Sequence, residues 1–466
     1  MNKENIVIYG ASGGGEKILL TLQNMGIEVD YFVDSNSEKW GLKFLGKDIK
    51  SPEEITKDKK IIIASELNQE QIEIRLAELN LTENIIMKEE IMLPFMCNLS
   101  IGTNSKEINN NGKSKIFIEL LEGVPTQPDG LADWCKIAAQ LLKERNKNVK
   151  IITSKKLGVP SENIELYEFI ETDYSTYWQD VEKLYYFLEK NLPCTVILNK
   201  QMQLFYAAAL LKKVYKNKIR LISVVHSDAC CLYKRSQLIN SYIDSFIAGS
   251  GVIKEKLFEY KIQKEKVVYQ AMPIAFSNLK NHEYSTSDEP ITIGYAGRLT
   301  VQVKRCDLLI QLIECLEKRK CNYKFYIAGA GEYEKIISDY VLQQQLTEKV
   351  IMCGNLKKNE IQEFWVNKDI CVLTSEKEGC CLSMAEAMVA GAVPVTTAFS
   401  SAIEYTTEAE AGYVVDFGNV NSIADIIGNL ELNRQSLQEQ GHKVQRYAIT
   451  KFSYSEYGCF LEEILK

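Results

Sequence analysis

The segment from Asp369 to Pro394 restricts the fold of this chain more than any other stretch. Asp369–Thr374 is an apolar run of the kind found in buried strands of parallel sheets. Leu382–Ala390 has a helical pattern, and Gly391 and Pro394 end it. A strand that passes through a short turn into a helix is the building unit of parallel α/β sheets, so the sequence predicts an α/β fold.

The turn of this unit carries groups suited to a phosphorylated polyol. Glu378 and Gly379 lie between the strand and the helix, and Glu386 lies in the helix on the side that faces the turn. Gly379 allows the backbone to approach a ligand, and the N–H groups around Cys381–Ser383 favour an anion. Carboxylates accept hydrogen bonds from hydroxyl groups. The alternative is a plain strand–turn–helix whose two acids are solvated surface charges.

The two acids have seven residues between them, and this spacing resembles the Glu-x7-Glu motif of the retaining family 4 glycosyltransferases, also called glycosyl transferases group 1. The resemblance implies that Glu378 contacts hydroxyl groups of a donor sugar and that Glu386 holds the ribose of its nucleotide. The sequence departs from relatives at Cys380 and Cys381, where an aromatic residue and a small residue or Pro are frequent, so the sugar stays open. The donor-binding residues implied by this motif are Gly379, Cys380, Cys381, Leu382, Ser383 and Glu386.

A second motif follows the predicted strand Ile291–Ala296. Gly297 and Arg298 come directly after it, and Lys304 precedes the next predicted helix. Two fixed cations would stabilise the charge that develops on a departing nucleoside diphosphate, and they do so most in the transition state. The segment resembles the G-R-L…K motif of the same family. The alternative is a pair of ordinary surface cations.

Three further positions follow from predicted strand ends, where ligands gather in open α/β sheets. His226 follows the strand Arg220–Val225, and the resemblance implies that it approaches the sugar and aids the transition state. The alternative interpretation is that His226 has only a structural role. In the family, main-chain groups bind the nucleotide base at the place where the short strand Val350–Gly354 ends, so the resemblance implies Met352 and Cys353 as the candidates for contacts to the base.

The loop after the strand Lys115–Leu121 is rich in Gly and Pro. In the family a Gly-containing loop at this point lies at the cleft, near the acceptor and the donor. Asp129 and Gly130 occupy that place here, although relatives often have two adjacent glycines. The alternative is a surface turn.

The amino-terminal residues have the layout of a dinucleotide-binding βαβ unit. The strand Asn5–Tyr9 runs into a Gly-rich turn, a helix over Glu16–Met25 and a second strand that ends at Asp34. The unit resembles the small Rossmann-like domains at the start of sugar-modifying acyltransferases and of some bacterial surface-polysaccharide proteins. It binds a nucleotide or nucleotide sugar, or it has a structural or assembly role. The residues of the candidate site are Gly10, Gly13, Gly15 and Asp34.

Composition excludes several classes. The net charge of −7 argues against non-specific nucleic-acid binding. The 13 cysteines lack zinc-type spacing, and neither a signal peptide nor a membrane span is apparent, so free thiols in the cytoplasm are expected. The basic patch Lys212–Arg220 is a solvated helix end or, alternatively, a peripheral contact with lipid head groups at the inner membrane face.

These patterns together predict a GT-B type fold: two facing Rossmann-like parallel-sheet domains with a cleft between them, preceded by a small Rossmann-like domain. The resemblance covers about Lys115 to the carboxyl end. The predicted parts are a domain at 1–99, a linker at 100–114, the acceptor domain at 115–272, the donor domain at 273–446, and a helix at 447–466 that packs back on the acceptor domain.

The predicted reaction is transfer of a hexose from a nucleotide-diphosphate sugar to an acceptor hydroxyl with retention of configuration, in bacterial surface glycan synthesis or protein glycosylation. No cofactor or metal is expected, and a glycan, a lipid-linked saccharide or a protein remains open as acceptor. The alternatives are a sugar phosphorylase of the same fold and a nucleotide-sugar-binding regulatory or assembly protein. The amino-terminal domain is also a candidate for homo-oligomerisation. An NAD-dependent epimerase is disfavoured, since no Tyr-x-x-x-Lys pair follows a Rossmann strand.

Overall fold

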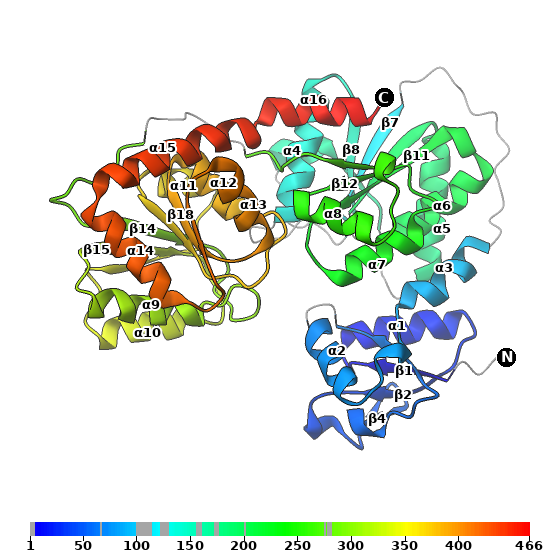
Figure 1. The fold of residues 1–466 in the computed structure, drawn as a ribbon. Helices are drawn as coiled ribbons and strands as arrows, with labels where there is room; N and C mark the ends of the chain where they lie inside the picture. The colour runs from blue at the N-terminus through cyan, green and yellow to red at the C-terminus, as the bar shows by residue number, and fades with distance from the viewer. Residues whose placement is uncertain are drawn as a thin grey trace. The chain divides into compact units, whose positions relative to one another are not determined.

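The computed structural model describes most of the chain and shows three sheets flanked by helices (Figure 1). The chain divides into two compact units, residues 1–123 with 152–221 and residues 124–151 with 222–466. The described residues are 5–65, 68–98, 114–121, 130–154, 161–171, 177–199, 202–274, 276 and 282–466.

The first sheet lies in the first unit and has the order β3-β4-β2-β1-β5-β6. β1 pairs in parallel with β2 and β5, whereas β3 and β4 form an antiparallel hairpin. Ile6 and Ile8 pack on one face of the sheet, and Val7 and Tyr9 pack on the other. The elements are β1 (Ile6–Tyr9), α1 (Gly13–Asn24), β2 (Val29–Val33), β3 (Lys43–Phe44), β4 (Lys47–Lys50), β5 (Lys60–Ile63), α2 (Gln69–Glu78), β6 (Ile85–Ile86) and α3 (Lys88–Asn98).

The second sheet has the order β13-β12-β11-β10-β7-β8-β9. Its strands are short apolar runs, as expected of a sheet covered by helices on both faces. All of Met202–Leu211 in α6 is buried. The elements are β7 (Lys115–Glu119), α4 (Gly130–Glu144), β8 (Asn148–Thr153), β9 (Tyr167–Phe169), α5 (Tyr177–Lys190), β10 (Cys194–Leu198), α6 (Met202–Val214), β11 (Ile219–Val225), α7 (Cys230–Ile239), β12 (Ser245–Ala248), α8 (Gly251–Glu259) and β13 (Val267–Tyr269).

The third sheet lies in the second unit and is parallel throughout, with the order β16-β15-β14-β17-β18-β19. The strand order changes direction between β14 and β17, and such a switch point is where open α/β sheets bind ligands. The elements are β14 (Ile291–Ala296), α9 (Asp307–Lys318), β15 (Tyr323–Ala328), α10 (Glu334–Gln343), β16 (Val350–Gly354), α11 (Lys358–Val366), β17 (Ile370–Leu373), α12 (Leu382–Ala390), β18 (Val393–Thr397), α13 (Ser400–Ala409), β19 (Tyr413–Val415), α14 (Val420–Leu432), α15 (Arg434–Lys451) and α16 (Tyr454–Ile464).

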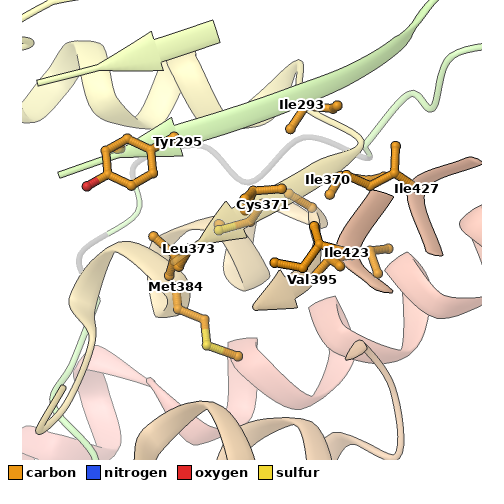
Figure 2. Packing of buried hydrophobic residues seen from close by; sticks show 14 of the residues in the cluster. Ile293, Tyr295, Ile370, Cys371, Leu373, Met384, Val395, Ile423 and Ile427 are labelled. Atoms are coloured by element: carbon orange, nitrogen blue, oxygen red, sulfur yellow. The ribbon is translucent and has the colours of Figure 1, made fainter. Parts of the chain in front are cut away.

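The core of the third sheet is formed by apolar side chains from its central strands and from the helices on its faces (Figure 2). Ile293, Ile370 and Val395 come from three neighbouring strands, and Met384 comes from α12. All four are fully buried. This packing fixes the ends of β14 and β17, which carry the predicted donor motifs.

The predicted single helix over residues 447–466 is wrong, because the structure breaks it into α15 and α16. Phe452 ends α15, and the Ser453 hydroxyl accepts from the Glu456 N–H at 3.3 Å, so it caps a new helix. α16 contacts α4: Trp134 Nε1 donates to Tyr457 Oη at 2.7 Å.

Of the predicted linker 100–114, only Ser114 lies within the described residues. The predicted boundaries at 99, 272 and 446 stay predictions.

Candidate functional site

The carboxyl ends of β14 and β17 bring together two motifs that are far apart in the sequence. Gly297 and Arg298 follow β14, and Glu378 and Gly379 follow β17. Lys304, from the loop after β14, reaches the β17 turn and donates to Oε1 of Glu378. The predicted cation and the predicted acid are therefore direct partners at the switch point of the third sheet.

The Lys304–Glu378 ion pair is partly withdrawn from water. The side chains are 13% and 15% exposed. Burial, the largest single effect, lowers the pKa of Lys304, but the charge and hydrogen bond of Glu378 together with the nearby Cys381 more than offset it, and the pKa is raised. Lys304 therefore stays charged at neutral pH, as a group that meets a diphosphate must be.

The loop that presents Lys304 has unusual backbone geometry. Val303 has a φ of 65° and Arg305 a φ of 50°, so both residues that flank Lys304 are in the left-handed region. This conformation is strained for a β-branched residue such as Val303, and strain of this kind is found at functional sites. The Glu376 N–H donates to the Val303 carbonyl at 2.8 Å and ties the loop to the β17 turn.

Arg298 lies at the same strand end. Its side chain is exposed, and its carbonyl accepts from the buried Tyr295 hydroxyl at 3.2 Å. The Arg298 charge lowers the pKa of Lys304, although less than Glu378 raises it, so the two cations are near one another. The two predicted cations thus lie near each other, beyond the carboxyl end of β14.

The Glu378 turn is held by hydroxyl groups that the sequence interpretation did not select. Ser375 Oγ donates to Glu378 Oε1 at 2.9 Å, and Ser400 Oγ donates to the Glu378 carbonyl at 2.7 Å. Ser375 lies just beyond the end of β17 and Ser400 is the first residue of α13, in the segment that follows β18. Their places directly after two strands of the third sheet are the signal that would have found them.

Gly379 and Cys380 bring the β17 turn against the end of β11. A Cβ atom on Gly379 would lie 2.5 Å from the His226 carbonyl oxygen, a distance that no larger residue allows. Cys380 Sγ lies 3.1 Å from the Gly249 carbonyl and 3.4 Å from that of His226. The departure from the family pattern at Cys380 is therefore accommodated by backbone contacts.

Cys381 and Ser383 shape the start of α12. Cys381, the N-cap, is in the left-handed region with a φ of 34°, and its side chain makes no cap hydrogen bond. The Ser383 hydroxyl donates to the Ala296 carbonyl of β14 at 2.7 Å. Because first-turn N–H groups have no intrahelical acceptor, the start of α12 suits an anion.

A small pocket, open to solvent, lies beside Glu386. Glu386 and Leu382 line it from α12, and Asp133 and Trp134 line it from α4. Gly130, at the start of α4, is so close to α12 that an added Cβ would lie 3.2 Å from Leu382 Cδ1. Gly130 is thus near the donor motif, whereas Asp129 lies outside the described residues.

His226 stands at the end of β11, and its ring lies edge-on to Trp134 with 5.0 Å between centroids. Burial lowers the pKa of His226 to about 3, so the imidazole is neutral at neutral pH. Sequence reasoning missed Trp134, whose only sign was its place in the first turns of the helix after the acceptor loop.

Met352 and Cys353 lie in β16, the edge strand next to β15, and are not in contact with the Glu378 turn in any interaction that the described residues show. The glycines between them and β14 have a packing role. A Cβ added to Gly329 would lie 1.8 Å from the Gly297 carbonyl oxygen, and one added to Gly331 would lie 2.3 Å from the Leu299 carbonyl oxygen. The β15 turn therefore supports the Arg298 turn.

In the amino-terminal domain predicted at residues 1–99, the Asp34 carboxylate is bound by neighbouring groups of the same chain. Its carboxylate accepts from the N–H groups of Ala11 at 3.0 Å and Asn36 at 2.9 Å, and it pairs with Lys39 at 2.8 Å. A Cβ on Gly15 would lie 2.1 Å from the Gly10 carbonyl, whereas one on Gly13 would meet nothing within 4 Å. Asp34 and Gly15 thus close the Gly-rich turn on itself.

Over the described part of the chain, no group of three or more His, Cys, Asp or Glu side chains is arranged to hold a metal ion. None of the helices within the described ranges is long and apolar enough to cross a bilayer.

Two family models match the chain. Residues 278–449 match "Glycosyl transferases group 1", and residues 2–87 match "C2185-like, N-terminal". The first match contains Arg298, Lys304, Glu378 and Glu386.

Curated relatives carry the same kind of domain. The capsular polysaccharide biosynthesis glycosyltransferase CapM of Staphylococcus aureus is 25% identical over 53% of this chain and 69% of its own length. The poly(ribitol-phosphate) alpha-N-acetylglucosaminyltransferase of Staphylococcus aureus (strain COL) is 29% identical over 34% of this chain and 32% of its own length.

Solved structures agree in fold. TarM has a TM-score of 0.62 at 14% identity, over 77% of this chain and 99% of its own. Anabaena HepE, solved with UDP and glucose, has a TM-score of 0.61 at 16% identity, over 76% of this chain and 99% of its own. The predicted GT-B fold is confirmed, and residues 278–449 form a glycosyltransferase domain of group 1.

Proposed function

We propose that this chain transfers a hexose from a nucleotide-diphosphate sugar to an acceptor hydroxyl, with retention of configuration, in the synthesis of a bacterial surface glycan. The observation that carries the proposal is the Lys304–Glu378 pair beside Arg298 at the switch point of the third sheet. It places cations for a diphosphate next to an acid for a sugar, on the residues that the family motifs indicate.

In this proposal the diphosphate lies between the two cations and the start of α12. Lys304 and Arg298 neutralise the negative charge that grows as the glycosidic bond breaks, and the first N–H groups of α12 bind the phosphate oxygens. Both interactions strengthen as the bond lengthens, which is the condition for accelerating the reaction.

The two acids orient the donor. Glu378 accepts from hydroxyl groups of the sugar, and its pairing with Lys304 and Ser375 holds its carboxylate in one position before the donor arrives. Glu386, which lines the pocket beside α4, accepts from the ribose. Gly379, Cys380 and Cys381 shape the turn in which the sugar lies.

Retention fits a front-face reaction, in which the departing phosphate oxygen and the acceptor hydroxyl lie on the same side of the sugar. Glu378 is held by a lysine and a serine, so it is a weak candidate for a covalent nucleophile. His226, neutral because of its low pKa, can accept a hydrogen bond from the sugar without adding charge. Met352 and Cys353 remain the candidates for the base, and Gly130 with Asp129 for the acceptor side.

The relatives support a surface glycan as product and UDP as nucleotide. One is named for capsular polysaccharide, one transfers N-acetylglucosamine to poly(ribitol-phosphate), and the HepE structure holds UDP and glucose. We therefore expect a UDP-sugar donor and a hydroxylated polymer as acceptor.

For the amino-terminal unit we propose an assembly or structural role. The engagement of Asp34 by Ala11, Asn36 and Lys39 supports it, because these groups occupy the carboxylate that a ribose would need. The nucleotide site at Gly10, Gly13, Gly15 and Asp34 is the competing proposal.

The test is a screen of nucleotide sugars for slow hydrolysis by the full chain without acceptor, followed by transfer to polyol-phosphate and polysaccharide acceptors. We expect one UDP-sugar to be hydrolysed and an α-linked product to form from an α-linked donor. Turnover that requires inorganic phosphate would identify a phosphorylase instead. Tight binding of nucleotide sugars without any turnover would favour the regulatory alternative.

A further inference from the structure

Thr374 lies at the end of β17 and touches the loop of Lys304 instead of the site itself. Its Oγ1 is 3.0 Å from the carbonyl of Lys304 and 3.1 Å from that of Arg305. The side chain is fully buried. Because carbonyls only accept, the Thr374 hydroxyl donates to this pair of oxygens.

The Lys304 loop needs such an anchor. The residues on both sides of Lys304, Val303 and Arg305, are in the left-handed region, with φ values of 65° and 50°. A non-glycine backbone stays in that region only where its surroundings determine it. Two residues of the turn after β17 hold the loop in this conformation. The Glu376 N–H donates to the Val303 carbonyl, and the Thr374 hydroxyl donates to the carbonyls of Lys304 and Arg305.

The same turn carries Glu378, the partner of Lys304. Thr374 fixes the backbone of the lysine, and Ser375, one residue later, donates to the carboxylate of Glu378 at 2.9 Å. The distance between the cation and the acid is therefore set from a single segment that follows β17. A displaced loop would move the ammonium relative to the diphosphate while leaving the rest of the site in place.

We propose that Thr374 is a positioning residue, which acts through the backbone of Lys304 to hold the ammonium where charge develops in the transition state. The catalytic consequence rests on the proposed function. The structural part, that the Thr374 hydroxyl holds the strained loop, does not depend on it.

The chain offers a matched control one strand away. Thr396 pairs with Leu373 across β17 and β18, and it is also fully buried. Its hydroxyl has no hydrogen-bond partner among the described residues. Thr396→Val therefore repeats the chemical change of Thr374→Val without removing a contact to the loop.

The kinetic test compares Thr374→Val, Thr374→Ser and Thr396→Val with the unmodified full chain, using hydrolysis of the accepted UDP-sugar. We expect Thr374→Val to lower kcat about tenfold or more with little change in the donor KM, because misplacement of a transition-state contact affects kcat. Thr374→Ser keeps the hydroxyl and should retain most of the activity. Equal kcat values for Thr374→Val and Thr396→Val would overturn the proposal.

A second measurement uses limited trypsin digestion under native conditions, with mass spectrometry of cleavage after Lys304 and Arg305. In Thr374→Val we expect cleavage there to be about tenfold faster than in Thr396→Val, because the loop opens more readily. Cleavage after Lys335, on exposed α10, serves as the reference. Unchanged cleavage would overturn the proposal even if no UDP-sugar is turned over, whereas faster cleavage in a chain without turnover would reject only the proposed function.

Discussion

Lys304 and Glu378 are 74 positions apart in the chain, yet the ammonium of the first donates to the carboxylate of the second. Each residue belongs to a different motif, and the contact joins the motifs into one site. The pair is mutually dependent, because removing one member of a partly buried ion pair leaves the other without compensation.

The first prediction concerns this pair. Glu378→Gln keeps the shape and a hydrogen bond to Ser375, but removes the charge that holds Lys304. We expect a loss of about 100-fold or more in kcat, comparable to removing one transition-state contact. Steady-state kinetics of donor hydrolysis measure it. The control is Asp339→Asn, which breaks the exposed pair with Lys335 on α10 and should leave kcat unchanged. Near-normal turnover of Glu378→Gln would remove the basis of the proposed function.

The second prediction concerns Gly379. Gly379→Ala would push a methyl group to 2.5 Å from the His226 carbonyl, so the turn or the end of β11 must shift. We expect at least a tenfold loss of kcat/KM at unchanged secondary structure, measured by kinetics and circular dichroism. Gly428→Ala in α14 is the control, since its added Cβ meets only Cys321 Sγ at 3.6 Å. Full activity of Gly379→Ala would contradict this close approach.

The third prediction concerns Asp34. Asp34→Asn weakens its pair with Lys39 and its acceptance from two N–H groups, each of which is a charge-assisted contact. We expect the amino-terminal unit to lose about 1–3 kcal/mol of stability, measured by urea denaturation, while donor hydrolysis stays unchanged. Asp48→Asn, in the exposed β3–β4 hairpin, is the control. Weaker nucleotide binding with unchanged stability would instead support a nucleotide site there.

The fourth prediction concerns pH. His226 has a pKa of about 3 in the folded chain, below the ordinary value near 6.5, because burial disfavours the charged ring. Between these two values the unfolded chain binds more protons, so the free energy of unfolding falls as pH is lowered from about 6.5. We expect urea titrations between pH 7 and 4.5 to show this slope, and His226→Gln to flatten it. His282, whose pKa burial also lowers, contributes to the remaining slope, and near pH 4.5 so do carboxylates such as Glu289, whose pKa is lowered by hydrogen bonds from Thr286. An equal slope in His226→Gln would show that the ring is solvated.

The fifth prediction concerns Trp134. Trp134→Phe removes the donor to Tyr457 and alters the wall of the pocket beside Glu386. We expect a several-fold rise in the donor or acceptor KM and a small loss of stability. Tyr457→Phe removes the same hydrogen bond from the other side and leaves the pocket wall intact, so it should reproduce the loss of stability alone. Identical kinetics for both variants would exclude a role of the indole in the pocket.

Sequence patterns predicted the strand, turn and helix that carry the Glu378 motif, because these elements form a local unit. The strand, turn and helix around Glu378 were predicted from apolar runs, one Gly and one Pro, and α12 begins at Leu382 and ends at Ala390 as expected. The Arg298 and Lys304 motif was found in the same way. Each signal lies within about 20 residues, a range over which hydrophobic periodicity and turn chemistry act.

Contacts between distant segments could not be predicted. Nothing near Lys304 in the sequence indicates that Thr374 binds its carbonyl, or that Gly379 must be small because of His226. The amino-terminal motif likewise gave no sign that the Asp34 carboxylate accepts from the Ala11 N–H and pairs with Lys39. The break at Phe452 was missed because Ser453 resembles any other polar residue of an amphipathic helix.

The contact between Trp134 and Tyr457 joins two residues that the ribosome makes at very different times. Tyr457 leaves the ribosome 323 residues after Trp134. At usual rates of synthesis this interval is about 15–65 s. During this interval α4 lacks α16, which packs against it in the folded chain, and the indole N–H lacks the Tyr457 hydroxyl that accepts its hydrogen bond. The packing around α4 is therefore completed only after the strands of all three sheets have been synthesised.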